Sequence, residues 1–296
     1  MSGAAAVVVN YKTRDHLVRC VASLRAGGGV GPIVVVDNHS GDGSEEALAG
    51  AEAVTFLDTG ANLGFGAAAN RGVAACTEGY VVIANPDLEV EPGAVAALVA
   101  ALEGDPGLAA VGPRIHTPDG RLYPSARRFP DLVTAVGHAV LGLHDPDNRF
   151  SRAYKMADWD HGRADVDWVA GTCMAVRRSA FEAVGGFDEG YFMYVEDVDL
   201  CWRLAARGWR VGYEPDARVH HVIGAASDRH PYRMMLEHHR SLWRFARRTT
   251  TGARRALLPA VAAGLAGRTG LAWLHHARRK PRREPSLVAS PGSGAP

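Results

Sequence analysis

The chain has 296 residues, of which 47% are hydrophobic and 22% are charged, the composition of an ordinary globular protein. This length allows a substantial buried core, and the composition excludes a wholly disordered chain, a collagen-like chain and a disulfide-stapled miniprotein. The net charge of +1 conceals an asymmetry: residues 229–296 hold 14 Arg and Lys against two Glu, whereas residues 1–228 carry a balance of −11. Such a basic tail suits a polyanionic partner, either a nucleic acid or an anionic membrane face.

The cysteines and the amino terminus predict the cellular compartment. The four cysteines, at positions 20, 76, 173 and 201, show neither a C-x-x-C spacing nor a metal-ligand spacing. The amino terminus enters an apolar segment directly, without a signal peptide, and no apolar run reaches the roughly 18 to 20 residues of a membrane span. We therefore expect a protein of the reducing cytoplasm that does not cross a membrane.

Residues 1–112 alternate between two kinds of hydrophobic pattern. Short apolar runs predict strands at Ala4–Tyr11, Ile33–Val36, Ala53–Leu57 and Tyr80–Ala84. Helical periodicity predicts helices at Thr13–Ala26, Ser44–Ala51 and Gly64–Cys76, and in the first turn of a fourth helix we expect Pro92. This alternation is typical of a parallel, doubly wound α/β sheet.

The second half is less regular. Arg114–Val166 is expected to be loop-rich with an apolar patch, and regular structure resumes at Trp168. A helix opens at Glu196, and on it Asp199 and Arg203 are four residues apart, which predicts a surface ion pair. Tyr232–Arg247 predicts a further helix, and the Pro-, Ser- and Gly-rich end of the chain predicts disorder.

Acidic residues stand at the ends of these predicted elements. Asp37 follows the second strand, Asp87 follows the fourth, and Glu196-Asp197 begins a helix. Each alone could be a turn former or a helix cap. Because the carboxyl ends of parallel strands line one edge of a sheet, together they predict a single ligand site. One such carboxylate with a diphosphate is enough to hold Mg²⁺ or Mn²⁺.

Other motifs are weak or absent. Gly64-Phe65-Gly66 loosely matches a dinucleotide fingerprint, but it follows the third strand rather than the first, and a small-residue helix packed closely on a sheet explains it equally well. A pair of histidines, His220 and His221, could complete a metal shell or simply end a strand. No G-x-S-x-G, H-E-x-x-H or P-loop motif supports a serine hydrolase, a zincin or an NTPase.

Six segments, in register over roughly residues 5–228, resemble the inverting family 2 glycosyltransferases of the GT-A fold. They are VVVNYKTRDHLVRCVASL, VVVDNHSGDGS, NLGFGAAANRG, VIANPD, WVAGTCMAVRR and GGFDEGYFMYVEDVDLCWR. Within that family the sequence is most similar to bacterial rhamnosyltransferases that act on lipid-linked N-acetylglucosamine. The NPD in place of D-x-D and the last of the six segments carry this narrower resemblance.

The resemblance implies a donor site and a metal site. Asp37 would accept a hydrogen bond from the pyrimidine of the donor. The other residues of the nucleotide-sugar site would be Asn10, Tyr11, Asn62, Gly64, Asn85 and Asp87. The metal, Mg²⁺ or Mn²⁺, would be held by Asp87 and His221, with His220 as the alternative to His221.

The resemblance also implies a catalytic base and an acceptor site. Asp197 would take the proton from an acceptor hydroxyl, with Glu196 beside it, in a single in-line displacement with inversion. The acceptor site would include Gly171, Thr172 and Asp188.

The expected organisation follows from the same resemblance. Residues 1–228 would form the GT-A domain, with a nucleotide-sugar half at 1–112 and an acceptor half at 113–228. Residues 229–280 would form a basic amphipathic helical extension on the inner face of the cell membrane, and 281–296 a disordered tail. A solvated helical face is the alternative for this extension, and nucleic acid is not the expected partner because no recognised module accompanies the charge.

The implied reaction moves L-rhamnose from dTDP-rhamnose onto a polyprenyl-diphosphate-linked N-acetylglucosamine or a related cell-envelope glycan. Two alternatives stay open. One is a family 2 transferase with another donor sugar (glucosyl, galactofuranosyl or mannosyl). The other is a catalytically silent scaffold that binds nucleotide or lipid.

Overall fold

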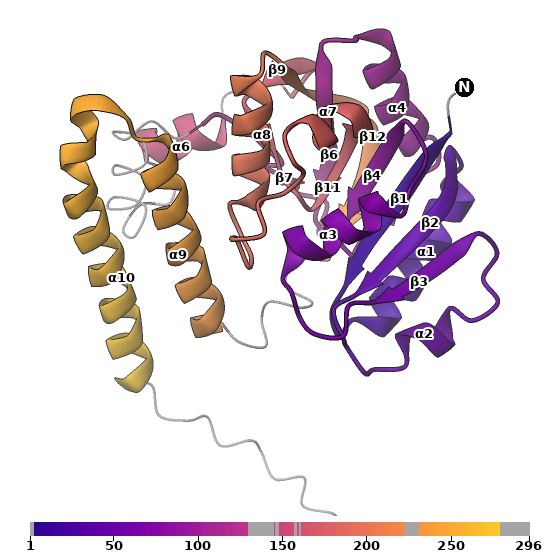
Figure 1. Ribbon diagram of the computed structural model, residues 1–296, viewed down its shortest axis with the longest axis horizontal. Helices are drawn as coiled ribbons and strands as arrows, with labels where there is room; N and C mark the ends of the chain where they lie inside the picture. Colours follow the sequence, from indigo (N-terminus) through magenta and orange to yellow (C-terminus); the bar gives the residue numbers. More distant parts are fainter. Residues whose placement is uncertain are drawn as a thin grey trace, which may run out of the picture. The chain divides into compact units, whose positions relative to one another are not determined.

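The structure is a computed structural model that describes residues 3–129, 145, 148–156, 159, 161–222 and 231–278. The chain divides into two compact units, Met1–Phe245 and Ala246–Pro296. The first unit contains a large mixed sheet with helices on both of its faces (Figure 1). The tail expected at 281–296 lies outside the described residues.

The amino-terminal half of the sheet is parallel. Its strands, in spatial order, are β3 (Val54–Asp58), β2 (Val30–Asp37), β1 (Ala4–Asn10) and β4 (Tyr80–Ala84). The helices of this half are α1 (Arg14–Gly27), α2 (Ser44–Ala47) and α3 (Phe65–Ala74). The predicted alternation is therefore confirmed, with element ends displaced by a few residues.

The second half continues the sheet beyond β4 with strands of both directions. The order is β11 (Cys173–Arg177), β6 (Leu108–His116), β12 (Arg210–His221) and β5 (Leu88–Val90). β11 runs antiparallel to both of its neighbours, whereas β6 and β12 are parallel. Beside them lie β7 (Leu122–Tyr123), which pairs with β6, and β9 (Ala164–Val166), which pairs with β12.

The segment expected to be loop-rich contains short elements. They are the end of β6, then β7, β8 (Ala126–Arg127), α6 (Arg149–Lys155) and β9; its apolar patch, at residues 132–143, lies outside the described residues. β8 pairs with β10 (Trp168–Val169), so a strand does begin at Trp168, but regular structure already returns before it, in α6 and β9. α7 (Arg178–Ala183) and α8 (Glu196–Ala206) follow β11.

Alternating side chains of the central strands fill two separate cores. Val7 and Val9 of β1 face one core, with α3 and α8, whereas Ala6 and Val8 face the other, with α1 and α4 (Ala94–Gly104). Both faces of the sheet are covered, which is why these strands are continuous apolar runs. The predicted fold class, an α/β fold of the GT-A type, is confirmed.

Two local features show where one helix begins and how another packs against the sheet. α4 begins at Ala94, after the left-handed Gly93, so Pro92 precedes the helix instead of occupying its first turn as predicted. In α3, a Cβ at Gly72 would overlap the Val7 side chain. The small residues of this segment therefore allow close packing on the sheet. This agrees with the interpretation of the segment as a small-residue helix, which was the alternative to a dinucleotide fingerprint.

The chain continues with α9 (Pro231–Thr249), η2 (Gly252–Leu257) and α10 (Leu258–Arg278). The first unit extends into α9 as far as Phe245, because Leu242 and Phe245 pack against the core. The helix predicted at Tyr232–Arg247 is thus confirmed. Within the described residues, no helix combines the length and the apolarity needed to span a membrane.

Candidate active site

The ends of β1 and β2 carry a buried polar pair. Asn10 and Asp37 are opposite in register, and the Asn10 amide Nδ2 donates to Oδ1 of Asp37 at 2.6 Å. Ser40 donates to the same carboxylate from its backbone N–H (2.7 Å) and its hydroxyl (2.6 Å). Both members of the pair are almost fully buried, so the Asp37 carboxylate is fixed before any ligand binds. Tyr11, by contrast, is half-buried beside Lys12.

The neighbouring residue Asn38 organises the loop before α3. Its Nδ2 donates to the Gly64 carbonyl at 3.2 Å, and its Oδ1 accepts the Leu63 N–H at 3.1 Å. Asn62 is exposed and accepts the Gly64 N–H at 3.0 Å. Sequence reasoning missed Asn38, although its position directly after Asp37 was a signal that could have drawn attention to it.

Asp87 meets His221 at the end of β12. The strand register sets His221 opposite Leu88, and its Nε2 lies 3.2 Å from Oδ1 of Asp87. Both side chains are 8% exposed. Within the described residues, Oδ1 of Asp87 has no well-aligned hydrogen bond beyond this contact, and Nδ1 of His221 has none at all, which is costly for buried polar atoms.

The two adjacent histidines point in different directions. Nε2 of His220 lies 2.8 Å from the Glu91 carboxylate, and this ring is half exposed. Successive residues of a strand point to opposite faces, so only one histidine can approach Asp87. The structure places His221 there, which was the preferred residue; His220 was the alternative.

Glu196 and Asp197 open α8 in a buried setting. The Asp197 carboxylate accepts the N–H of Gly171 at 2.8 Å on Oδ2 and that of Val198 at 2.8 Å on Oδ1. Burial raises the pKa of Asp197, and these two N–H groups and the positive charge of Arg127 oppose the rise. Burial and the neighbouring charge of Asp197 raise the pKa of Glu196 to about 8.

One loop joins the two acidic sites. Gly171 donates to Asp197, and the adjacent Thr172 carbonyl accepts the Asn85 N–H at 2.9 Å. β11 begins at the next residue and runs antiparallel to β4, which brings this loop to the carboxyl end of β4, where Asn85 and Asp87 follow. The antiparallel insertion of β11 therefore brings the candidate base close to the candidate metal ligands.

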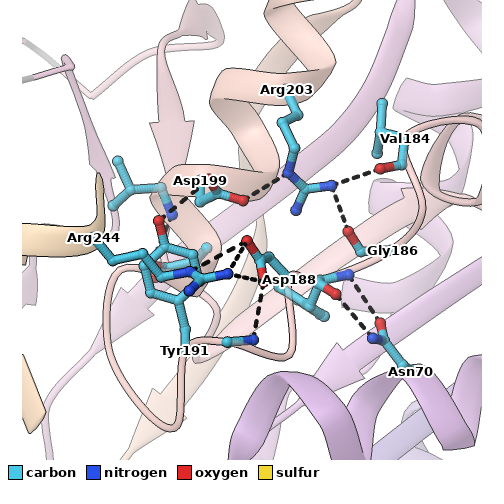
Figure 2. A network of polar contacts seen from close by, with 12 residues as sticks. Asn70, Val184, Gly186, Asp188, Tyr191, Asp199, Arg203 and Arg244 are labelled. Carbon is cyan, nitrogen blue, oxygen red and sulfur yellow. Dashed lines mark hydrogen bonds and ion pairs between the residues drawn. The ribbon is translucent and has the colours of Figure 1, made fainter. Parts of the chain in front are cut away.

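Asp188 has a different environment from the one predicted. Its carboxylate accepts from Nη2 of Arg244 at 2.8 Å and 3.0 Å and from Nε at 3.3 Å, and the Gly190 N–H donates to it at 2.9 Å (Figure 2). Acceptor binding by Asp188 stays a prediction. In the structure this carboxylate is bound to α9.

The predicted ion pair between Asp199 and Arg203 forms, but it is buried and not on the surface. Nε of Arg203 donates to Oδ2 of Asp199 at 2.6 Å, but Asp199 is 0% exposed and Arg203 only 9% (Figure 2). The guanidinium also donates to the carbonyls of Val184 and Gly186, at 2.8 and 2.6 Å. The i, i+4 spacing identified the partners, but burial depends on the 184–191 segment that packs over this face of α8.

The fold is the GT-A fold. Its structure is similar to GalNAc-T7 solved with UDP, GalNAc and Mn²⁺ (TM-score 0.57, 17% identity, 75% of this chain and 44% of that one). It is also similar to the mannosyltransferase PcManGT from Pyrobaculum calidifontis, solved with GDP-Man and Mn²⁺ (TM-score 0.57, 17% identity, 93% and 79%). At this identity the likeness concerns the fold.

Comparison with known sequences identifies the protein family. The family model described as "Glycosyl transferase family 2" matches residues 5–185, and "Glycosyl transferase family group 2" matches 137–251. The chain is 40% identical over 296 aligned residues, 95% of this chain and 96% of the relative, to the N-acetylglucosaminyl-diphospho-decaprenol L-rhamnosyltransferase of Mycobacterium tuberculosis. The chain belongs to glycosyltransferase family 2.

Proposed function

We propose that this protein is a metal-dependent inverting rhamnosyltransferase. It would move L-rhamnose from dTDP-rhamnose onto a polyprenyl-diphosphate-linked N-acetylglucosamine. The observation that carries the chemistry is the Asp197 carboxylate, oriented by two N–H groups and joined through the Gly171–Thr172 loop to the segment that bears Asp87. The mycobacterial rhamnosyltransferase, 40% identical over nearly the whole of both chains, supports the choice of sugar and acceptor.

The reaction assigns a proton transfer to Asp197. The carboxylate takes the proton of an acceptor hydroxyl while that oxygen attacks the anomeric carbon. The bond from this carbon to the diphosphate oxygen breaks, and the electron pair leaves with the nucleoside diphosphate, so the configuration inverts. Because burial keeps Glu196 protonated near neutral pH, its pKa being about 8, the pair presents one negative charge to the acceptor instead of two.

Asp87 and His221 are suited to a divalent cation. They offer a buried carboxylate oxygen, Oδ1 of Asp87, and a buried imidazole whose Nε2 lies 3.2 Å from that oxygen; in the described part of the chain neither atom makes a well-aligned hydrogen bond to another residue. The described residues contain no group of three or more acidic, histidine or cysteine side chains arranged for a metal. Mg²⁺ or Mn²⁺ would therefore take further ligands from the donor diphosphate and water. When bound, the cation offsets charge on the departing diphosphate.

Asp37 would select the nucleobase. Its carboxylate is fixed by Asn10 and Ser40 but keeps lone pairs for a further donor, as carboxylates accept up to about four hydrogen bonds. A pyrimidine with a ring N–H offers such a donor. This position, at the edge shared with Asp87, fits a donor that lies across the carboxyl ends of β2 and β4.

The second compact unit would dock on an anionic membrane surface. Four cations, Arg247, Arg248, Arg254 and Arg255, are exposed at its start. Leu257 is 46% exposed and Trp273 is 63% exposed. Exposed apolar side chains among cations are typical of helices at a membrane interface, where each cation contributes about 1 kcal/mol. A polyprenyl-linked acceptor would be presented at such a surface.

Release of nucleoside diphosphate tests the proposal. A panel of nucleotide sugars, including dTDP-rhamnose, is incubated with a short polyprenyl-diphospho-N-acetylglucosamine and Mg²⁺ or Mn²⁺. We expect acceptor-dependent, chelator-sensitive release from dTDP-rhamnose, and none from Asp197→Asn, although that variant still binds the nucleotide. Release from another donor alone would overturn the choice of rhamnose. Silence across the panel with intact nucleotide binding would favour a scaffold.

The metal site has a matched pair of variants. His221→Gln is expected to raise the metal concentration needed for half-maximal nucleotide binding about tenfold or more, because it removes a buried ligand. His220→Gln removes the adjacent ring, which faces Glu91, and is expected to leave that concentration unchanged. Equal effects of the two variants would contradict the assignment of His221.

A further inference from the structure

The segment that leads into the catalytic helix is bound on one side by α9. In this segment, residues 187–195, Asp188 forms its ion pair with Arg244, and the Met193 carbonyl accepts the Ser241 hydroxyl at 3.0 Å. The guanidinium carbon of Arg244 lies over the Tyr191 ring, 5.3 Å from the centre of that ring (Figure 2). We refer to residues 187–195 as the pre-catalytic loop.

The opposite side of the pre-catalytic loop is bound by α3. Asn70 makes a two-way pair with the backbone of Phe187, accepting its N–H and donating to its carbonyl, both at 2.9 Å. The Phe65 N–H donates to the Phe192 carbonyl at 3.1 Å, and Gly64 approaches this carbonyl so closely that a Cβ would overlap it. The loop is thus held between two helices that are far apart in sequence.

The loop ends in strained backbone next to the catalytic pair. Tyr194 and Val195 have φ of 66° and 70°, in the left-handed region that non-glycine residues rarely adopt and that a β-branched valine avoids most strongly. Such a conformation costs about 1–3 kcal/mol per residue and persists only where surrounding contacts impose it. The next two residues are Glu196 and Asp197, so this strain sets the direction in which α8 begins.

We propose that Arg244 is a positioning residue for Asp197. By holding Asp188 it fixes one end of the pre-catalytic loop, and together with Ser241 at the other end and the α3 contacts on the opposite side it helps to hold the backbone conformation from which α8 starts. This inference rests on the proposed function and deepens it. It gives one face of α9 a role in catalysis, and it makes Asp188 the anchor of the loop.

The exposure of the Arg244–Asp188 ion pair indicates that it contributes little to the stability of the fold, so its proposed role is to position Asp197. The side chains of Arg244 and Asp188 are 47% and 20% exposed, and ion pairs this close to solvent stabilise a fold little. The buried Arg203–Asp199 pair stabilises the same region from inside. A displacement of about 1 Å at a catalytic group, in contrast, costs on the order of 100-fold in rate.

Kinetics of Arg244→Met test the proposal, with Arg240→Met as the matched control. Arg240 lies one turn earlier on α9, is exposed and pairs with Glu237 of its own helix, so its loss removes the same charge without touching the loop. With a water-soluble acceptor analogue, we expect kcat of Arg244→Met to fall about 10- to 100-fold. The donor KM should stay within about threefold, because the donor residues lie elsewhere. Arg244→Lys should recover part of kcat, and Arg240→Met should equal the wild type.

Hydrogen exchange supplies a readout that does not depend on turnover. In Arg244→Met the amides of residues 193–198 are expected to exchange at least tenfold faster, whereas Arg240→Met leaves them unchanged. Wild-type kcat together with unchanged exchange in Arg244→Met would overturn the proposal. So would a rise in the acceptor KM alone in Asp188→Asn, which would instead assign Asp188 to the acceptor. Inactivity of the wild type toward every donor would refute the proposed function, and the exchange result would still decide the role of Arg244.

Discussion

Replacement of Glu196 by glutamine is expected to remove the contribution of this buried carboxyl to the pH dependence of stability near neutrality. Glu196 is 6% exposed, and burial together with the charge on Asp197 raises its pKa from 4.5 to about 8. Between these values the unfolded chain loses this proton while the folded chain keeps it. The folded state then binds more protons, so the free energy of unfolding falls as the pH rises.

The magnitude follows from the two pKa values. Each pH unit inside the window costs about 1.4 kcal/mol, so between pH 5.5 and 8 this carboxyl lowers the free energy of unfolding by roughly 3 kcal/mol. Glu196→Gln keeps the shape of the side chain but cannot ionise, so the contribution of this position to the pH dependence disappears.

Urea unfolding at pH 5.5, 7 and 8, followed by tryptophan fluorescence, measures this difference. The curve for Glu196→Gln should be flatter than that of the wild type by roughly 3 kcal/mol over this range. Glu45→Gln, which removes an exposed carboxyl in the first turn of α2, is the control and should retain the wild-type slope. Parallel curves for wild type and Glu196→Gln would refute the conclusion that Glu196 is a protonated buried acid.

Three further predictions concern the groups around Glu196 and Asp197. Gly64→Ala should unfold several degrees lower than the wild type and lose activity, because φ is +86° and the new Cβ would overlap the Phe192 carbonyl; a wild-type melting temperature would show that the two segments do not meet. Arg127→Met should move the acidic limb of the kcat–pH profile to higher pH, because the positive charge lowers the pKa of Asp197. Arg127→Lys keeps the charge and should leave that limb in place; if both variants move it equally, the effect is not one of charge. Arg203→Met should cost about 3–5 kcal/mol in urea unfolding, because it leaves the buried Asp199 carboxylate without its positive counter-charge, and a loss below about 1 kcal/mol would contradict the buried pair.

The predictions from sequence succeeded where the physics is local. Runs of valine and alanine predicted the parallel strands, and the spacing of Leu17, Cys20, Val21 and Leu24 predicted the buried face of α1. Acidic residues directly after those strands predicted the edge of the sheet at which Asp37 and Asp87 now lie. The family and the GT-A fold were likewise within reach, because six motifs in one order are specific even without coordinates.

Only the tertiary structure decided the features that depend on contacts between segments far apart in sequence. Strand alternation made one histidine of the pair face Asp87, but which one depended on the register of β12 with β5. Asp199–Arg203 is visible as an i, i+4 pair, yet its burial is decided by the segment that packs over it.

The link between Asp188 and Arg244 illustrates the same division between local and long-range determinants. The sequence by itself determined the strands, the helices and the acidic residues at their ends, because these depend on periodicity over a few residues. Asp188 and Arg244 are 56 positions apart, and the sequence contains no pattern that pairs them. That contact exists only because Leu242 and Phe245 pack against the core and bring α9 over the pre-catalytic loop.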